Sequence, residues 1–250
     1  MMNPQEVNPD SNTDAGISSK KSRVGAGVAS LTLKHGSERV RRGLEDAALR
    51  RIIRRQGFEI RHLTGREEVA QALELELEVW REKDYGDLED YKKYIPQSII
   101  FAAFDGDKCV GMNRLFSAYP EIPPFLDVMP IFDPTLKQNL IEAGKNLKIE
   151  EFGTVAVAKN YRGSRIFLDI CRVAFRDATA RGIEAWSIIM EPDRVRQMNS
   201  GLAFTFEQIG PATNYQGGDC AAHIMHFSDV RRHMSTSKPD LYDWFVNQPL

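Results

Sequence analysis

The stretch that decides the fold is VAVAKNYRGSRIFLDICRVAF, residues 155–175. Its first residues, Val155 to Val157, are apolar and typical of a buried strand. The turn Tyr161–Ser164 follows, and a helical pattern begins at once and ends at Gly182. A strand that leads through a tight turn into a helix predicts a sheet packed against helices.

The rest of the chain alternates between strand-like and helix-like segments. Apolar runs separated by turn residues predict strands, and the turn Asp105–Asp107 predicts a hairpin between two of them. The helical spacing of apolar residues such as Val69, Leu73 and Trp80 predicts the helices. The predicted strands cover residues 58–63, 98–104, 108–118, 150–157, 184–190, 204–210 and 220–227, and the predicted helices cover residues 65–83, a segment from 134, 164–181 and 192–202. The fold class is therefore α/β (α+β), with a mixed, mostly antiparallel sheet and helices on both faces.

Composition divides the chain into four segments. Residues 1–36 are polar and are predicted to form a disordered tail. Residues 37–56 carry an apolar stripe among many arginines and predict a basic amphipathic helix. This helix is either a solvated helix packed on the domain or a docking surface for an acidic partner, a nucleic acid or an anionic membrane. Residues 57–232 are predicted to form the folded domain, and residues 233–250 a C-terminal tail with one weak helical turn.

A proline-rich segment, YPEIPPFLDVMPIFD, covers residues 119–133. We interpret it as a surface excursion between the hairpin and the next helix. Asp133 is expected to cap that helix, which begins at Pro134.

The bulk composition is that of an ordinary globular protein. The chain has 250 residues, of which 42% are hydrophobic and 27% charged, and a formal net charge of −2. This gives no reason to expect nucleic acid as a partner. The three cysteines are widely separated and show no metal-ligand spacing, so we expect no metal and a reducing, cytoplasmic location. The polar start predicts no signal peptide, no apolar run reaches the length of a membrane span, and membrane contact is expected to be peripheral at most.

The segment from Glu150 to Met190 resembles the GNAT acyltransferase superfamily. In that fold a central strand leads into a pantetheine-binding turn and helix, and a second strand splays away to form the acyl cleft. Further segments are similar, in chain order, to motifs of the N-acyl amino acid synthases and acyl-homoserine-lactone synthases. These segments are Glu82–Asp87, Gly111–Leu115, Asp127–Pro130, Glu150–Val157 and Gly210–Gly217. Thr154 stands where the lactone synthases keep an arginine, so the resemblance favours the N-acyl amino acid synthases.

The resemblance implies an N-acyltransferase that moves a fatty acyl group from a thioester donor to the α-amine of an amino acid. One alternative is a coenzyme A-dependent acetyltransferase that acts on small amines or protein. Another is a catalytically silent GNAT-fold module that only binds a ligand or partner. Gly201 stands where the superfamily usually has a tyrosine that acts as the general acid. A catalytically silent module would also lack this tyrosine.

Three kinds of charged residue are candidates for the acceptor side of such a site. Glu151 opens the central strand and is the candidate catalytic base, although it could equally be a strand-end glutamate that faces solvent or pairs with a basic residue. Arg114 lies in an otherwise apolar strand and needs a partner, and the resemblance implies Asp84 or Asp87. These residues could hold the carboxylate and ammonium of an amino acid, or they could form a structural ion pair.

The turn before the helix predicted at residues 164–181 gives an indication of the thioester donor. Superfamily members that bind coenzyme A keep small residues where this chain has Arg165 and Phe167, and bulk there obstructs a pyrophosphate cradle. We therefore expect an acyl carrier protein as the donor, with acyl-phosphopantetheine and no tightly bound cofactor. The alternative is acyl-coenzyme A, with its phosphates held by arginines. The candidate donor-binding residues are Val155, Val157, Arg162, Gly163, Arg165, Arg172 and Arg176, of which the last three share one helix face.

Overall fold

In a computed structural model of the chain, the structure describes residues 58–85, 96, 98–117 and 123–249. The predicted tail at 1–36, the basic helix at 37–56 and the site candidate Asp87 lie outside the described residues. The described strands are β1 (Glu59–His62), β2 (Ser98–Asp105), β3 (Lys108–Phe116), β4 (Ile149–Val157), β5 (Ala185–Met190), β6 (Glu207–Gln208), β7 (Thr213–Tyr215) and β8 (Gly218–His226). The described helices are α2 (Arg66–Glu82), α4 (Pro124–Val128), α5 (Pro134–Lys145), α6 (Ile166–Ala180), α7 (Pro192–Leu202), α8 (Phe227–Ser237) and α9 (Pro239–Tyr242). Single turns of 3-10 helix (Lys159–Tyr161) and π-helix (Asp243–Asn247) complete the set.

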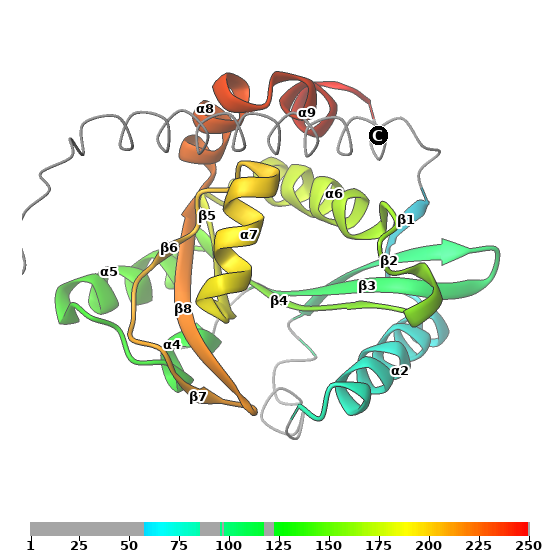
Figure 1. The fold of residues 1–250 in the computed structure, drawn as a ribbon, viewed down its shortest axis with the longest axis horizontal. Helices are drawn as coiled ribbons and strands as arrows, with labels where there is room; N and C mark the ends of the chain where they lie inside the picture. Colours follow the sequence, from blue (N-terminus) through cyan, green and yellow to red (C-terminus); the bar gives the residue numbers. More distant parts are fainter. Residues whose placement is uncertain (1–57, 86–95, 97, 118–122, 250) are drawn as a thin grey trace, which may run out of the picture. The chain divides into compact units, whose positions relative to one another are not determined.

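The strands form one sheet in the order β1-β2-β3-β4-β5-β8-β6, and β7 pairs with β8 (Figure 1). The pairs from β1 to β4 are antiparallel, β4 and β5 are parallel, and β5 and β8 are antiparallel again. This confirms the predicted mixed, mostly antiparallel sheet. The predicted hairpin is also confirmed, because β2 and β3 pair antiparallel up to Asp105↔Lys108.

Helices cover both faces of the sheet, as predicted. On one face α6, α8 and the C-terminal turns pack over an aromatic core that includes Phe175 and Trp186. On the other face α2 packs over β2, β3 and the second half of β4, and α4 and α5 pack over the first half of β4, β5 and β8. The close approach of α6 to the sheet depends on Gly111 in β3, because a Cβ at that position would lie 2.3 Å from the Cγ2 of Ile166. The cap predicted for the helix at Pro134 is confirmed, because the carboxylate of Asp133 accepts a hydrogen bond from the backbone N–H of Thr135 at 2.8 Å.

The interpretation of residues 119–133 as a surface excursion is wrong for its middle part. Residues 124–128 form α4, in which Phe125 is fully buried and Leu126 is 2% exposed. Apolar spacing did not predict this helix, because prolines on both sides of the short apolar segment interrupt the helical pattern. Since α4 packs against β4 and β5, its backbone reaches the candidate site, as described below.

The end predicted for the domain at Arg232 is also wrong. The segment 233–249 continues α8 and adds α9 and the π-helical turn, and its residues Leu241, Trp244 and Phe245 are buried. The ring of Phe245 packs against Phe175 of α6, with centroids 5.2 Å apart. Burying these aromatic side chains supplies more free energy than one weak helical turn could on its own.

Candidate active site

A pocket opens where β4 and β5 separate. The two strands pair only from Ile149↔Ala185 to Glu151↔Ser187, and beyond this point they diverge (Figure 1). The second half of β4 continues to pair with β3 on its other side, as at Asn113↔Val155. The separation leaves a pocket of about 230 Å³, walled by α2, β4, β5, the start of α6, α7 and the turn between β7 and β8.

Most of the pocket wall is apolar. Its apolar side chains include Val79, Phe152, Val155, Phe167, Met190 and Met198. Polar groups are few, and the charged ones are Glu76, Glu151, Glu191 and Arg194. An apolar cleft with a small number of charged groups suits a ligand that has a hydrocarbon part and one polar reacting end.

Glu151 lies in this pocket with only 2% of its surface exposed. Burial raises the pKa of Glu151 to about 8, while a hydrogen bond from the backbone of Phe125 in α4 and the charge of Arg114 both lower it. A carboxyl group with this pKa exchanges its proton near neutral pH. It is therefore suited to general acid–base chemistry, which an exposed glutamate at the end of a strand is not.

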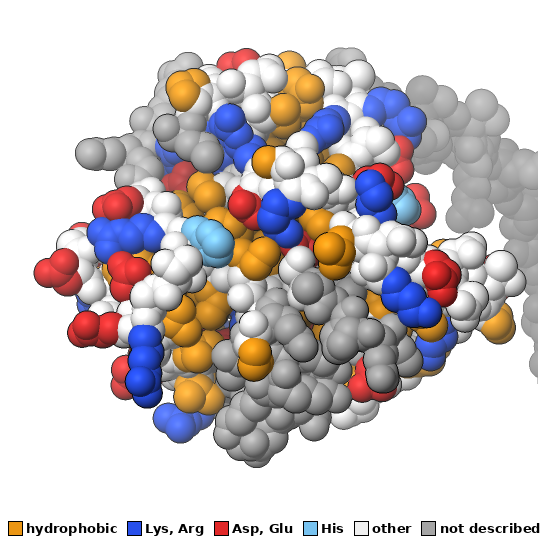
Figure 2. All heavy atoms as spheres, turned by 180° about the vertical axis from the view of Figure 1, so that it is seen from behind, with side chains coloured by type: hydrophobic (Ala, Val, Ile, Leu, Met, Phe, Trp, Pro, Cys, Tyr) orange, Lys and Arg blue, Asp and Glu red, His pale blue; other side chains and the backbone are white. Residues whose placement is uncertain are grey.

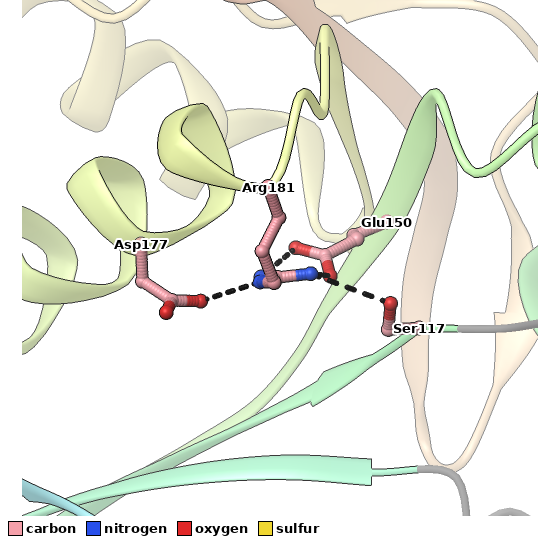
Figure 3. Close-up of polar contacts among 4 residues, drawn as sticks. All are labelled: Ser117, Glu150, Asp177 and Arg181. Atoms are coloured by element: carbon pink, nitrogen blue, oxygen red, sulfur yellow. Dashed lines mark hydrogen bonds and ion pairs between the residues drawn. The ribbon is translucent and has the colours of Figure 1, made fainter.

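The adjacent Glu150 has a different environment, although its side chain is also fully buried. Figure 3 shows its carboxylate facing the guanidinium of Arg181, which follows α6 and also donates to Asp177 at 2.7 Å. Arg181 further reaches Ser117, at the end of β3, at 3.5 Å (Figure 3). Glu150 thus takes part in an ion pair that ties α6 to the sheet, and its neighbour Glu151 faces the pocket.

Arg114 has a partner that the sequence did not predict. Its guanidinium lies 2.8 Å from Oε1 of Glu76 in α2, and the two side chains are 1% and 3% exposed. Thr154, which faces the pocket, also donates a hydrogen bond to Oε1 of Glu76. The predicted pairing of Arg114 with Asp84 is wrong, because Asp84 is exposed beyond the end of α2 and no ion pair between these two described residues is formed.

The turn between β4 and α6 places its residues away from the pocket. The guanidinium of Arg162 forms two hydrogen bonds with Glu82, at 2.7 and 2.6 Å, and Gly163 supplies a positive φ of 75°. Of the seven candidate donor-binding residues, Val155 lines the pocket and the other six do not. Phe167, at one of the positions where a small residue is usual, does line it.

The α6 arginines do share one face, but the C-terminal segment covers that face. Arg165 and Arg172 each lie 4.8 Å from the ring of Trp244, and Arg165 also pairs with Asp169 at 2.6 Å. Arg172 donates to the carbonyls of Gln248 and Pro249 at 2.7 Å. Arg176 donates to the same carbonyl of Gln248. The prediction that these arginines form an open surface for a carrier protein is therefore wrong.

The surface shown in Figure 2 carries charges of both signs. Lys and Arg side chains lie among Asp and Glu side chains and between apolar ones, and they do not gather into one basic area on this face. Any electrostatic attraction of a carrier protein would have to come from other cations than those of α6.

We expect Arg172→Met to lower the free energy of unfolding by about 1–3 kcal/mol, because the carbonyls of Gln248 and Pro249 lose the charged donor that joins the C-terminal segment to α6. The measurement is urea denaturation of the full chain. Arg232→Met is the matched control, since Arg232 is 79% exposed in a surface ion pair with Asp229 and should change stability little. Equal stability of the two variants would contradict a structural role for Arg172.

Two pocket residues that the sequence analysis missed lie where β5 meets α7. Glu191 directly follows β5, and Arg194 lies in the first turn of α7. Cys220 of β8 lies near both. Burial and the charges of Glu191 and Asp219 raise the pKa of its thiol to about 11, against the opposing charge of Arg194. The sequence feature that could have indicated Glu191 is its position at the end of the strand that diverges from β4, where side chains border a cleft.

Among the described residues no group of three or more His, Cys, Asp or Glu side chains is arranged to hold a metal ion. No described helix combines the length and the apolar character needed to cross a bilayer.

Neither a protein-family model nor a curated protein matches the amino-acid sequence. Solved structures do match the fold. One is FeeM, an N-acyl amino acid synthase from uncultured soil microbes, with a TM-score of 0.58 and 15% identity over 71% of this chain and 94% of that chain. Another is BjaI, a CoA-dependent acyl-homoserine lactone synthase in a structure with MTA, with a TM-score of 0.50 and 14% identity over 72% of this chain and 89% of that chain. The order of the strands, the separation of β4 from β5 and these similarities together show that the chain has the fold of the GNAT acyltransferase superfamily.

Proposed function

We propose that the protein is an N-acyltransferase that moves a fatty acyl group from a thioester donor to the α-amine of an amino acid. The observation that carries this proposal is the buried carboxyl group of Glu151 in an apolar pocket between the diverging strands. FeeM, whose structure is similar, is described as an N-acyl amino acid synthase, and this supports the same class of product.

The chemistry requires a neutral amine and a route for one proton. The amine nitrogen attacks the thioester carbonyl, the carbon–sulfur bond breaks, and the sulfur leaves as a thiolate. The proton that the amine loses passes to the carboxylate of Glu151, directly or through a water molecule, and then on to the thiolate. A carboxyl group with a pKa near 8 can accept and release a proton near neutral pH, and this suits Glu151 to the transfer.

The free edge of β4 supports binding of an extended donor. From Phe152 onward this edge faces the pocket and pairs with no other described strand. Backbone groups at an unpaired strand edge form hydrogen bonds with an extended chain that carries amides, and phosphopantetheine is such a chain. The acyl group would then lie among the apolar side chains of Phe152, Phe167 and Met198.

We propose an acyl carrier protein as the donor, with acyl-coenzyme A as the alternative. The bulk of Arg165 and Phe167 at the turn supports the carrier protein, because small residues normally let the backbone approach a pyrophosphate there. BjaI, which has the same fold, is described as CoA-dependent, so the fold alone is compatible with either donor. The arginines of α6 do not add to this proposal, because the C-terminal segment covers them.

The donor is tested by presenting the same acyl chain on a carrier protein and on coenzyme A and comparing kcat/KM. We expect the carrier-protein thioester to be the better substrate by about tenfold or more, because Arg165 and Phe167 obstruct the pyrophosphate of coenzyme A at this turn and a carrier protein presents no pyrophosphate there. Equal kcat/KM for the two donors would contradict the proposal for the donor and leave acyl transfer intact.

The function itself is tested by mass spectrometry of products. The full chain is incubated with long-chain acyl thioesters and a mixture of amino acids, and N-acyl amino acids are the expected products. Acetyl-coenzyme A with simple amines as the better substrates would favour the acetyltransferase. The absence of any amide product from folded protein would favour a silent binding module.

A further inference from the structure

The residue predicted from the sequence to bind the acceptor carboxylate is not available to it. Arg114 is 1% exposed, is paired with Glu76, and is not part of the pocket wall. The described lysines and arginines contribute one residue to that wall, Arg194 of α7. Its side chain is 56% exposed, so a ligand in the pocket can reach it.

Arg194 is held in a way that a ligand can replace. Its Nε lies 3.1 Å from Oε2 of Glu191, whose side chain is 32% exposed. A pair this exposed is weak and is screened by salt. No hydrogen bond within the described part of the chain uses the two terminal nitrogens of Arg194, and these are the atoms that bind a carboxylate in the bidentate manner.

Glu191 lies against the turn between β7 and β8. A Cβ placed on Gly218 would lie 3.7 Å from Oε1 of Glu191, which puts the carboxylate at the rim of the pocket. Glu191 precedes α7 but its side chain makes no capping hydrogen bond to the helix. Because the carboxylate is not needed as a cap, it can move away from Arg194 when another carboxylate arrives.

We propose that Arg194 binds the α-carboxylate of the acceptor amino acid and that the substrate carboxylate takes the place of Glu191. The inference rests on the proposed function and adds to it the residue that selects amino acids over amines without a carboxylate. The α-amine would then point toward β4, where Glu151 accepts its proton. Arg194 is a binding residue in this scheme, so its loss should act on KM and leave kcat nearly unchanged.

The test compares each amino-acid acceptor with the amine that lacks its carboxylate, at a fixed thioester donor. For Arg194→Met we expect the KM of the amino acid to rise about tenfold or more, since methionine cannot donate a charge-assisted hydrogen bond to the carboxylate. The KM of the amine should stay the same, and Arg194→Lys should restore part of the preference. Arg196→Met is the matched control, because Arg196 is on the same helix, is 71% exposed, pairs with Asp193 and lies outside the pocket.

A second variant removes the competitor instead of the binding group. Glu191→Gln is expected to lower the KM of the amino acid and leave that of the amine unchanged, because Arg194 no longer has an internal carboxylate. If Arg194→Met changes the KM of both acceptors equally, or of neither, the inference is wrong while acyl transfer stands. If the unmodified protein acylates no acceptor at all, the proposed function fails first and the inference fails with it.

Discussion

Replacing Glu151 by glutamine is expected to lower turnover by about 10²–10⁴-fold, the usual contribution of a positioned general base. Glutamine has nearly the same size as glutamate, and it cannot accept the proton of the attacking amine. The measurement is kcat with saturating acyl thioester and amino acid. Donor binding should be retained, because the apolar wall around Phe152 and Phe167 is unchanged.

The pH dependence of the same variant separates catalysis from packing. A general base works in its deprotonated form, so the rate of the unmodified protein should rise with pH through about 8, the pKa of Glu151. In Glu151→Gln the residual rate should lack this ionisation. If the variant keeps the full rate, or if its rate still rises with pH near 8, the proton is accepted by another group.

The stability of Glu151→Gln should change in the opposite direction from its activity. The pKa of Glu151 is raised from 4.5 to about 8 in the folded protein, so the folded state holds the proton more tightly than the unfolded state. This contribution to stability is complete below pH 4.5 and is lost as the pH rises to about 8. Glutamine has no such loss, so thermal unfolding should show the variant becoming more stable relative to the unmodified protein between pH 5 and 8. A site whose activity depends on an unfavourably buried group shows this exchange of stability for function.

The alternation of strands and helices could be predicted because it is a local property of the sequence. Apolar spacing located α2 and α6, and the residues Pro192 and Leu202 bounded α7 as expected. The position of Glu151 also followed from the resemblance, since its strand was recognised. Its burial did not, because the backbone that covers it belongs to α4, in a segment that its prolines made look exposed.

Side-chain contacts between residues that are far apart in the sequence could not be predicted. Helical spacing correctly placed Arg165, Arg172 and Arg176 near one face of α6, and spacing carries no information on what covers that face. The cover comes from Trp244 and the carbonyls of Gln248 and Pro249, more than 70 residues further along the chain. An arginine face of a helix is therefore equally compatible with a docking surface and with a structural contact, and the C-terminal aromatic residues decide between them.

The partner of Arg114 shows the same limit at the site itself. Glu76 lies in the run LELELE of α2, where leucine and glutamate alternate and the glutamates look like a solvated face. In the helix Leu75 and Glu76 are both buried, since successive residues of a helix turn by only about 100°: Leu75 packs in the core under α2, and Glu76 pairs with Arg114 of β3. A buried glutamate needs a cation, and the nearest one in space is on β3, 38 residues away.

Breaking the ion pair between Arg114 and Glu76 should be the most destabilising single change at the site. Arg114→Met leaves the carboxylate of Glu76 buried at 3% exposure without its guanidinium, and removal of one member of a buried pair costs about 3–5 kcal/mol. Glu76→Leu leaves the charge of Arg114 buried and should cost a similar amount. The double variant Arg114→Met/Glu76→Leu removes both charges and should recover most of the loss, because apolar side chains of similar volume pack well in such places. Urea denaturation of the four proteins gives the coupling free energy directly.

Kinetics of the folded fraction of Arg114→Met give a second, independent result. The charge of Arg114 lowers the pKa of Glu151, so without it the pKa of Glu151 should rise and the pH at which the rate is half-maximal should move upward. The KM of the acceptor should change little, because the acceptor carboxylate binds elsewhere. Two results would contradict a structural role for this pair: a double variant no more stable than the single ones, and a large, selective rise in acceptor KM at normal stability. The second result would return Arg114 to the acceptor site, and the first would mean that the sheet and α2 are held together by packing alone.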